Sequence, residues 1–263
     1  MPTELIAQQQ DAALVLTLRD PDTRNALSRE VYARGVELIK SAAADPSIRA
    51  LVLRGDGDTF CAGGNLQRIL GVRGKGPEEG ARFQRESVDL LAAWVMAMAE
   101  CPKPVIAAVE GYAAGAGASL ALACDLVVAS REAKFVMSYA RVGFSPDGGG
   151  SWQLARFLPR AWALKALWLG TPLDAERLHQ HGLVTDLCEP GQTHSTALSL
   201  AAQLARMAPN AVASVKRLSQ QALQHELSAQ LVAEREHFVA NLFHPNGAEG
   251  PTAFLEKRHP RFE

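Results

Sequence analysis

Short runs of apolar and β-branched residues recur through the first two thirds of the chain, each bounded by glycine, proline or charged residues. This pattern predicts β-strands at 13–18, 50–54, 105–109, 125–129 and 135–137. Helical periodicity occupies 28–44 and 81–100, and Ser28 has the residue type and the position of a helix N-cap. The alternation of strand and helix predicts an α/β fold with a largely parallel sheet.

The pattern changes near Leu198, because helical periodicity continues from there with almost no strand-like sequence. The helical segments are 201–207, 211–223 and 227–242. Pro209 marks one break between helices, and the sequence His-Pro-Asn-Gly at 244–247 marks another. We therefore expect two regions, an α/β core over residues 1–198 and a helical region over residues 199–263.

Composition and charge exclude several classes of protein. A chain of 263 residues with 48% hydrophobic residues can bury a large core, and 27 basic against 28 acidic residues give no field that favours nucleic acid or an anionic membrane. The N-terminal stretch has neither a basic segment nor a long apolar run, and no later segment has the apolar length of a membrane span. We expect a soluble, cytoplasmic protein without a bound metal. The widely spaced cysteines are interpreted as small buried side chains, and they are Cys61, Cys101, Cys124 and Cys188.

Two segments rich in small residues each follow a predicted strand. The first, 59–66, contains Gly63 and Gly64, and the second, 110–119, contains the run Gly-Ala-Gly-Ala. The first segment alone also fits an ordinary strand-to-helix turn, and the second fits close helix packing. The second segment does not have the spacing of a dinucleotide loop, a phosphate loop or a nucleophile elbow. Together, two such turns can bring two free backbone N–H groups to a single oxygen. That pair of donors stabilises a developing oxyanion.

At these segments the sequence resembles the crotonase (enoyl-CoA hydratase/isomerase) family. The resemblance rests on FCAGGNL and GYAAGAGASLALACDLVVA, and it continues through AKFVMSYARVGFSPDGGGSWQLARFLPR and GLVTDL to AFLEKRHPRF. It implies a crotonase-type spiral of ββα units followed by a helical trimerisation region. It also implies acyl-CoA substrates, with coenzyme A as part of the substrate and no permanently bound cofactor.

The resemblance also assigns roles to individual residues. Gly64 and Ala116 match the positions whose N–H groups hold the thioester oxyanion. The adenine and phosphates of coenzyme A are expected near Ala62 and near the Arg-Asn-Ala-Leu stretch that contains Arg24 and Ala26, with Arg24 as the phosphate contact. A solvated arginine without a ligand fits Arg24 equally well. Phe254 and Lys257 match family positions that contact the nucleotide bound to a neighbouring subunit, which implies a trimer or a hexamer.

The chain departs from the family pattern at two positions. Hydratases of the family activate water with two glutamates, and this chain has Ser119 and Tyr139 there. This argues against the two-glutamate mechanism. We expect Ser119, Met137 and Tyr139 to form the wall of the substrate pocket.

Asp147 in FSPDGGG is the remaining acidic candidate. Relatives with an aspartate here include dienoyl-CoA isomerases and the isomerases of phenylacetate degradation, where it moves a proton, and aryl-CoA dehalogenases, where it attacks as a nucleophile. An aspartate before a glycine-rich helix start also favours an N-cap. Burial in an apolar pocket would raise its pKa toward the range useful for proton transfer.

The favoured function is therefore an isomerase that moves a proton through a thioester enolate, with Asp147 carrying the proton. The alternatives are an enoyl-CoA hydratase and a hydrolase that uses Asp147. Outside enzymes, an RNA-associated binding protein of the same fold is possible in principle, but the predicted helix 28–44 carries no lysine-rich stripe. We expect no nucleic acid and no membrane among the partners.

Overall fold

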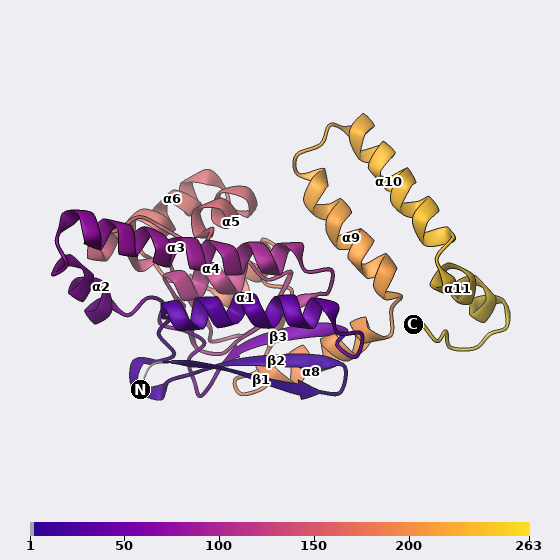
Figure 1. The fold of residues 1–263 in the computed structure, drawn as a ribbon, viewed down its shortest axis with the longest axis horizontal. Helices are drawn as coiled ribbons and strands as arrows, with labels where there is room; N and C mark the ends of the chain where they lie inside the picture. The colour runs from indigo at the N-terminus through magenta and orange to yellow at the C-terminus, as the bar shows by residue number, and fades with distance from the viewer. Residues whose placement is uncertain (1–2) are drawn as a thin grey trace.

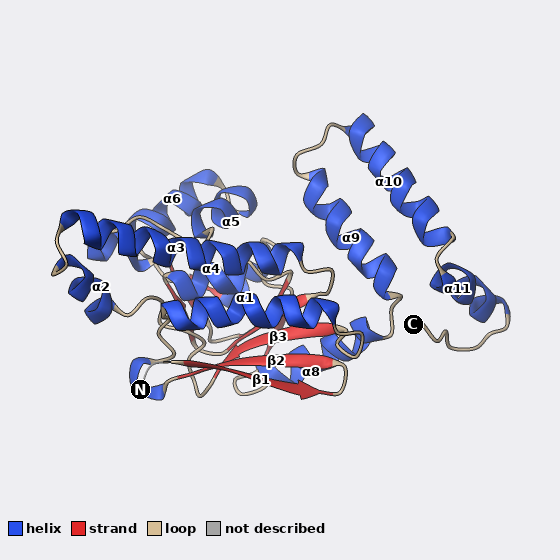
Figure 2. Cartoon of the chain, in the orientation of Figure 1, coloured by secondary structure: helices blue, strands red, loops and turns tan. Residues whose placement is uncertain are grey.

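The computed structural model describes residues 3–263, so the first two positions of the N-terminal stretch lie outside the described residues. The strands form one sheet of six, in the order β1-β2-β3-β4-β6-β9, and one sheet of three, in the order β5-β7-β8. Figure 2 shows β1, β2 and β3 side by side in red. The strands of the large sheet are β1 (Glu4–Gln10), β2 (Ala13–Arg19), β3 (Ala50–Gly55), β4 (Val105–Val109), β6 (Leu126–Ser130) and β9 (Asp186–Cys188). Those of the small sheet are β5 (Tyr112–Ala114), β7 (Lys134–Val136) and β8 (Leu173–Asp174).

The predicted parallel α/β arrangement is confirmed, since every pairing in the large sheet after β2 is parallel. The sequence did not indicate β1, which pairs antiparallel with β2 and ends in three glutamines. Asp11 closes this hairpin with a positive φ of 52°. An edge strand with one partly solvated face lacks the apolar signal of its neighbours.

Alternate residues of the central strands enter two separate cores. Leu16, Leu51 and Leu53 pack with α1 (Arg29–Ala44) and α3 (Pro77–Glu100) on one face. Val15 and Val52 pack on the other face with α8 (Thr193–Ala205), as Figure 1 illustrates. Helices cover both faces of the large sheet, so the strands between them have continuous apolar sequences.

The helices over the first face begin close to the predicted positions. Ser28 caps α1, and its hydroxyl accepts the N–H of Val31 at 3.4 Å. Helix α3 starts four residues before the expected Ala81, because Pro77 in its first turn is compatible with a helix start. The other helices of the core are α2 (Leu66–Arg73), α4 (Ala116–Leu122), α5 (Gly150–Phe157), α6 (Arg160–Leu169) and α7 (Ala175–Gln180), with short 3₁₀ turns η1 (Pro21–Thr23) and η2 (Ser138–Val142).

The last three helices stand away from the core in Figure 1. They are α9 (Pro209–Ala222), α10 (Leu227–Leu242) and α11 (Pro245–Leu255). Lys216 ties α9 to the core, because its ammonium donates to the carboxylate of Asp125 at 2.6 Å and to the carbonyl of Met98 at 2.8 Å. Helix α8 runs across the expected boundary at residue 198 and packs on the sheet, so the separation from the core is visible from α9 onward. Among residues 3–263, no helix combines the length and the apolar character needed to cross a bilayer.

Gly35 lies where α1 meets α3, and any side chain there would overlap the indole of Trp94. We expect Gly35→Ala to lower the free energy of unfolding by about 1–3 kcal/mol, because an extra methyl group in a filled core displaces its neighbours. Chemical denaturation would measure the change. Gly71→Ala in α2 is the matched control, since its methyl group would meet no atom within 4 Å. That control should be neutral or slightly stabilising, and an equal loss in both variants would contradict the packing argument.

Candidate active site

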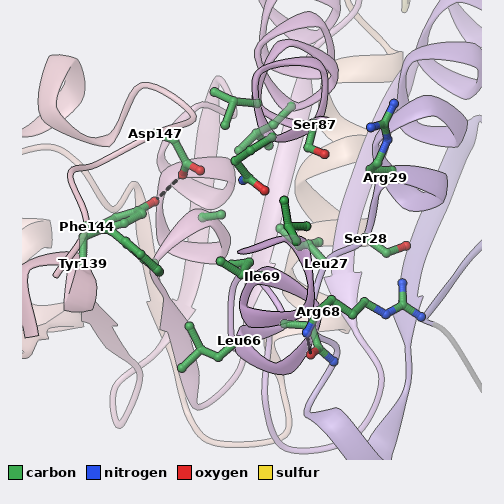
Figure 3. A pocket seen from close by; sticks show the side chains of 18 of the residues that line it. Leu27, Ser28, Arg29, Leu66, Arg68, Ile69, Ser87, Tyr139, Phe144 and Asp147 are labelled. Atoms are coloured by element: carbon green, nitrogen blue, oxygen red, sulfur yellow. Dashed lines mark hydrogen bonds between the residues drawn. The ribbon is translucent and has the colours of Figure 1, made fainter. Parts of the chain in front are cut away.

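A cavity of about 770 Å³ opens between α1, α2, α3 and the loop that follows η2. Figure 3 shows Tyr139 and Asp147 on one side of it and Leu27, Ser28 and Arg29 on the other. The cavity wall includes several of the residues that the sequence singled out, namely Ala62, Gly64, Ala116, Tyr139 and Asp147. Segments more than eighty residues apart in the chain therefore meet in one place.

Backbone hydrogen bonds fix the first small-residue loop against its neighbours. The N–H of Ala62 donates to the carbonyl of Arg24 at 2.9 Å, and the N–H of Leu27 donates to the carbonyl of Gly63 at 2.7 Å. On the other side, the N–H of Ala114 donates to the carbonyl of Cys61 at 2.8 Å. The loop is thus held between the segment before α1 and the strand before α4.

The absence of side chains lets the two loops touch. A Cβ atom on Gly63, which has a φ of +87°, would lie 2.6 Å from the carbonyl oxygen of Ala114 and 3.3 Å from the nitrogen of Ala116. A Cβ atom on Gly117 would lie 2.7 Å from the sulfur of Cys61. Glycine is required at both positions because any side chain would separate the loops.

The N–H groups of Gly64 and Ala116 are available to a ligand. Among residues 3–263, neither donates to a protein acceptor, and both residues line the cavity. Ala116 is the first residue of α4, so its N–H also lies at the positive end of the helix dipole. Two N–H groups beside one cavity can stabilise an oxyanion.

Asp147 accepts a hydrogen bond from the hydroxyl of Tyr139 at 2.6 Å. Burial raises the pKa of the Asp147 carboxyl above its ordinary value, and the Tyr139 hydrogen bond offsets part of that rise. The N-cap interpretation of Asp147 is wrong, because Gly149 occupies the N-cap position of α5 and no side chain caps that helix end. The carboxylate faces the cavity, with its pKa moved toward the range useful for proton transfer.

Ser119 lies on the side of Tyr139 that faces away from the cavity. Its hydroxyl lies 3.1 Å from the hydroxyl of Tyr139, so Ser119, Tyr139 and Asp147 form a chain of hydrogen-bonding groups. Burial raises the pKa of Tyr139, and its hydroxyl therefore stays protonated as a donor to Asp147. Ser119 and Met137 are fully buried behind the wall rather than in it, where both lie close to Gly150.

The remaining predicted site residues lie outside the cavity wall. Arg24 is exposed and has a φ of 56°, and its carbonyl accepts the N–H of Ala62. Ala26 is buried, and its carbonyl accepts a hydrogen bond from the hydroxyl of Thr3. Phe254 and Lys257 lie at the end of α11, and Phe254 is 82% exposed. The structure of one chain does not bring these last two residues to the cavity. No cluster of three potential metal-binding side chains occurs within residues 3–263.

Sequence reasoning missed the part of the wall that the helices supply. From α3 these residues are Phe83, Gln84, Ser87, Val88 and Leu91, and from the start of α1 they include Arg29 and Tyr32. The spacing of Gln84, Ser87, Val88 and Leu91 by three and four residues places them on one helix face. That spacing was visible in the sequence, but it did not reveal whether the face met the sheet or a cavity. Three basic side chains also line the cavity, Arg29, Arg68 and Lys75, and each of them is paired with a glutamate carboxylate.

Comparison with known proteins places these features in a wider group. The enoyl-CoA hydratase/isomerase family model matches residues 8–263. The chain is 37% identical to 1,2-epoxyphenylacetyl-CoA isomerase of Escherichia coli K12, over 98% of this chain and 97% of that one. It is 35% identical to 2,3-dehydroadipyl-CoA hydratase of the same organism, over 99% of both chains. The structure is also similar to a crystal structure of an enoyl-CoA hydratase from Polaromonas sp. JS666, with a TM-score of 0.95, 51% identity, and coverage of 98% and 99% of the two chains.

Removing the Tyr139 hydroxyl should raise the pKa of Asp147 further. The hydrogen bond stabilises the ionised carboxylate and so lowers the pKa of Asp147. Without it, in Tyr139→Phe, burial raises that pKa with less opposition from a hydrogen bond. A carbon-13 NMR titration of the aspartate carboxyl groups would measure the shift. Tyr112→Phe removes the hydroxyl of an exposed tyrosine outside the cavity and should leave the titration unchanged. A fall in the pKa of Asp147 in Tyr139→Phe would contradict the assignment.

Proposed function

The chain belongs to the enoyl-CoA hydratase/isomerase family, and we propose that within it the protein is an isomerase that moves a proton on an acyl-CoA thioester. Coenzyme A enters as part of the substrate. The observation that carries the proposal is the position of Asp147 on the same cavity wall as the N–H groups of Gly64 and Ala116. A carboxylate and an oxyanion site at one cavity are the two elements that proton transfer beside a thioester requires.

In the proposed reaction, one oxygen of Asp147 removes a proton from the carbon chain of the substrate. The electron pair of the broken C–H bond moves onto the thioester oxygen, and the N–H groups of Gly64 and Ala116 stabilise the resulting enolate. Removing one such donor typically costs about 3 kcal/mol in the transition state. The protonated Asp147 then returns the proton to a different carbon, so the double bond has moved and no atom is gained or lost.

The hydroxyl chain behind Asp147 supports a proton-transfer role. Tyr139 donates to Oδ1 of Asp147, which leaves Oδ2 without a side-chain partner among residues 3–263. The carboxylate is therefore held by one oxygen and presents the other for the reaction. Because its pKa is raised, activity should be lost on acidification at a higher pH than for an ordinary aspartate.

A hydratase is the second candidate, favoured by the names of two of the similar proteins. It would need water held against Asp147, because Ser119 and Tyr139 stand where the family resemblance expects glutamates and their hydroxyls bond to each other. Neither hydroxyl is itself a base at neutral pH, and the carboxylate that they reach is Asp147, so Asp147 would have to activate the water. The isomerase needs only the groups already described, and for that reason we favour it.

Coenzyme A binding is proposed at the rim near Ala62 and Ala26. Arg24 is exposed there and joined to Ala62 through its backbone carbonyl. Its guanidinium is the proposed contact for a phosphate group, since arginine matches phosphate oxygens with two parallel N–H donors.

The C-terminal helices support a proposed trimer or hexamer. Large apolar side chains are exposed along α9, α10 and α11, among them Leu231, Phe238, Phe243, Phe254 and Leu255. Large apolar side chains exposed on neighbouring helices are typical of a surface that packs against another subunit. In the assembly, Phe254 and Lys257 would complete the nucleotide site of a neighbouring subunit.

The role of Asp147 is tested by Asp147→Asn, which keeps the size of the side chain and removes its ability to accept a proton. Exchange of substrate protons with deuterated solvent, at the γ-carbon of crotonyl-CoA and the α-carbon of phenylacetyl-CoA, should fall by roughly 10²-fold or more. Binding measured by calorimetry should change little. Asp174→Asn, on an exposed aspartate paired with Lys134, is the control. Exchange in Asp147→Asn at the wild-type rate would place the base elsewhere.

The assembly is tested by light scattering at micromolar concentration, which should give the mass of three or six chains. Phe254→Ala should weaken acyl-CoA binding in the assembled protein, because the side chain would contact the nucleotide of the neighbour. The measured mass should stay the same in this variant if its role is in binding. A monomeric wild-type protein would overturn the proposed roles of Phe254 and Lys257 at the nucleotide site of a neighbouring subunit.

A further inference from the structure

Tyr32 is a polar residue of the cavity that the reaction described above does not use. It lies on α1, one turn after Ser28, and it is only 8% exposed although it lines the cavity. Its hydroxyl has no hydrogen-bond partner in the protein among residues 3–263. The other tyrosine of the wall differs in this respect, since the hydroxyl of Tyr139 contacts both Ser119 and Asp147.

The surroundings of Tyr32 are partly polar as well. Gln84 on α3 lines the same cavity, and its amide has no protein partner among residues 3–263. Ser87, one turn after Phe83 on the same helix, also lines the cavity, and its hydroxyl donates to the carbonyl of Phe83. The same helix also contributes the apolar side chains of Val88 and Leu91 to the cavity wall. A hydrocarbon packed against this wall would cover the Tyr32 hydroxyl and leave it without a hydrogen bond, at a typical cost of about 1–3 kcal/mol.

We propose that the Tyr32 hydroxyl binds an oxygen atom on the acyl group of the substrate, so that the protein prefers acyl-CoA thioesters bearing a hydroxyl, ether or carbonyl oxygen over purely hydrocarbon ones. The inference rests on the proposed function only in that it takes the ligand to be an acyl-CoA. Tyr32 is a specificity-determining residue in this scheme and takes no part in proton transfer.

The chemistry of the tyrosine fits a donor. Burial, with a smaller effect from the charge of Asp147, raises the pKa of Tyr32, so the hydroxyl keeps its proton at neutral pH. Tyr32 and Asp147 both line the cavity. Sites that hydrogen-bond a substrate oxygen discriminate strongly against analogues that lack it, because the protein group is then left unpaired.

The test compares phenylacetyl-CoA with its three ring-hydroxylated isomers, in which the oxygen is placed at each ring position in turn. We expect at least one hydroxylated isomer to bind wild-type protein tenfold or more tightly than phenylacetyl-CoA in calorimetry. In Tyr32→Phe this preference should fall below threefold. Tyr112→Phe makes the same chemical change at an exposed tyrosine outside the cavity, and it should keep the wild-type preference.

Two results would overturn the proposal. One is equal binding of all four thioesters by wild-type protein, which would mean that only water meets the Tyr32 hydroxyl. The other is a preference that persists in Tyr32→Phe while thermal unfolding shows that the variant is folded. Failure of the Tyr32 proposal is distinguished from failure of the proposed isomerase function by measuring exchange of the α-protons of phenylacetyl-CoA in wild-type protein. If exchange is absent and the oxygen preference is present, the isomerase proposal fails and the role of Tyr32 stands.

Discussion

The site depends on the contact between two loops that have no side chains where they touch. Gly63 approaches the carbonyl of Ala114, and Gly117 approaches the sulfur of Cys61, at distances that admit no Cβ atom. Hydrogen bonds from the segment before α1 hold the first loop in this place. This contact brings the N–H groups of Gly64 and Ala116 to one cavity. The strands of the parallel sheet that precede the two loops set the distance between them. A preorganised pair of donors needs no rearrangement when charge develops, which is the basis of its effect on rate.

Around this fixed pair, the chain carries an uncommon set of polar groups. The positions at which the family resemblance expects two glutamates hold hydroxyl groups, and both of these hydroxyls are buried and linked to Asp147. Close packing explains part of the arrangement, because Gly150 leaves room for Ser119 and Met137 behind the wall. One carboxylate supported by two neutral groups avoids the repulsion between two buried carboxylates. The same backbone frame can therefore present different acid and base groups without any change in the positions of the Gly64 and Ala116 N–H groups.

Local signals predicted the central strands, α1 with its Ser28 cap and the helical C-terminal region, because each follows from periodicity or from a cap. The edge strand β1 was missed because its glutamines do not alternate with apolar residues. Gly64, Ala116 and Asp147 were selected because small-residue runs and a motif mark them in the sequence, and the structure places all three on one cavity. Tyr32 and Gln84 carry no such mark, since a tyrosine or glutamine on a helix face is equally consistent with packing against a sheet. Their position on the cavity follows from how α1 and α3 are placed, which is a property of long-range packing.

The burial of all four thiols has a practical consequence. Burial raises the pKa of Cys61 to about 12, and it also raises the pKa values of Cys101, Cys124 and Cys188. Alkylating reagents attack thiolates, so the folded protein should resist them at neutral pH. A cysteine introduced at an exposed position would then be the one that a maleimide dye reaches. Fluorescent or spin labels could report on α9, α10 and α11 in the wild-type background, without first replacing Cys61, against which Gly117 packs.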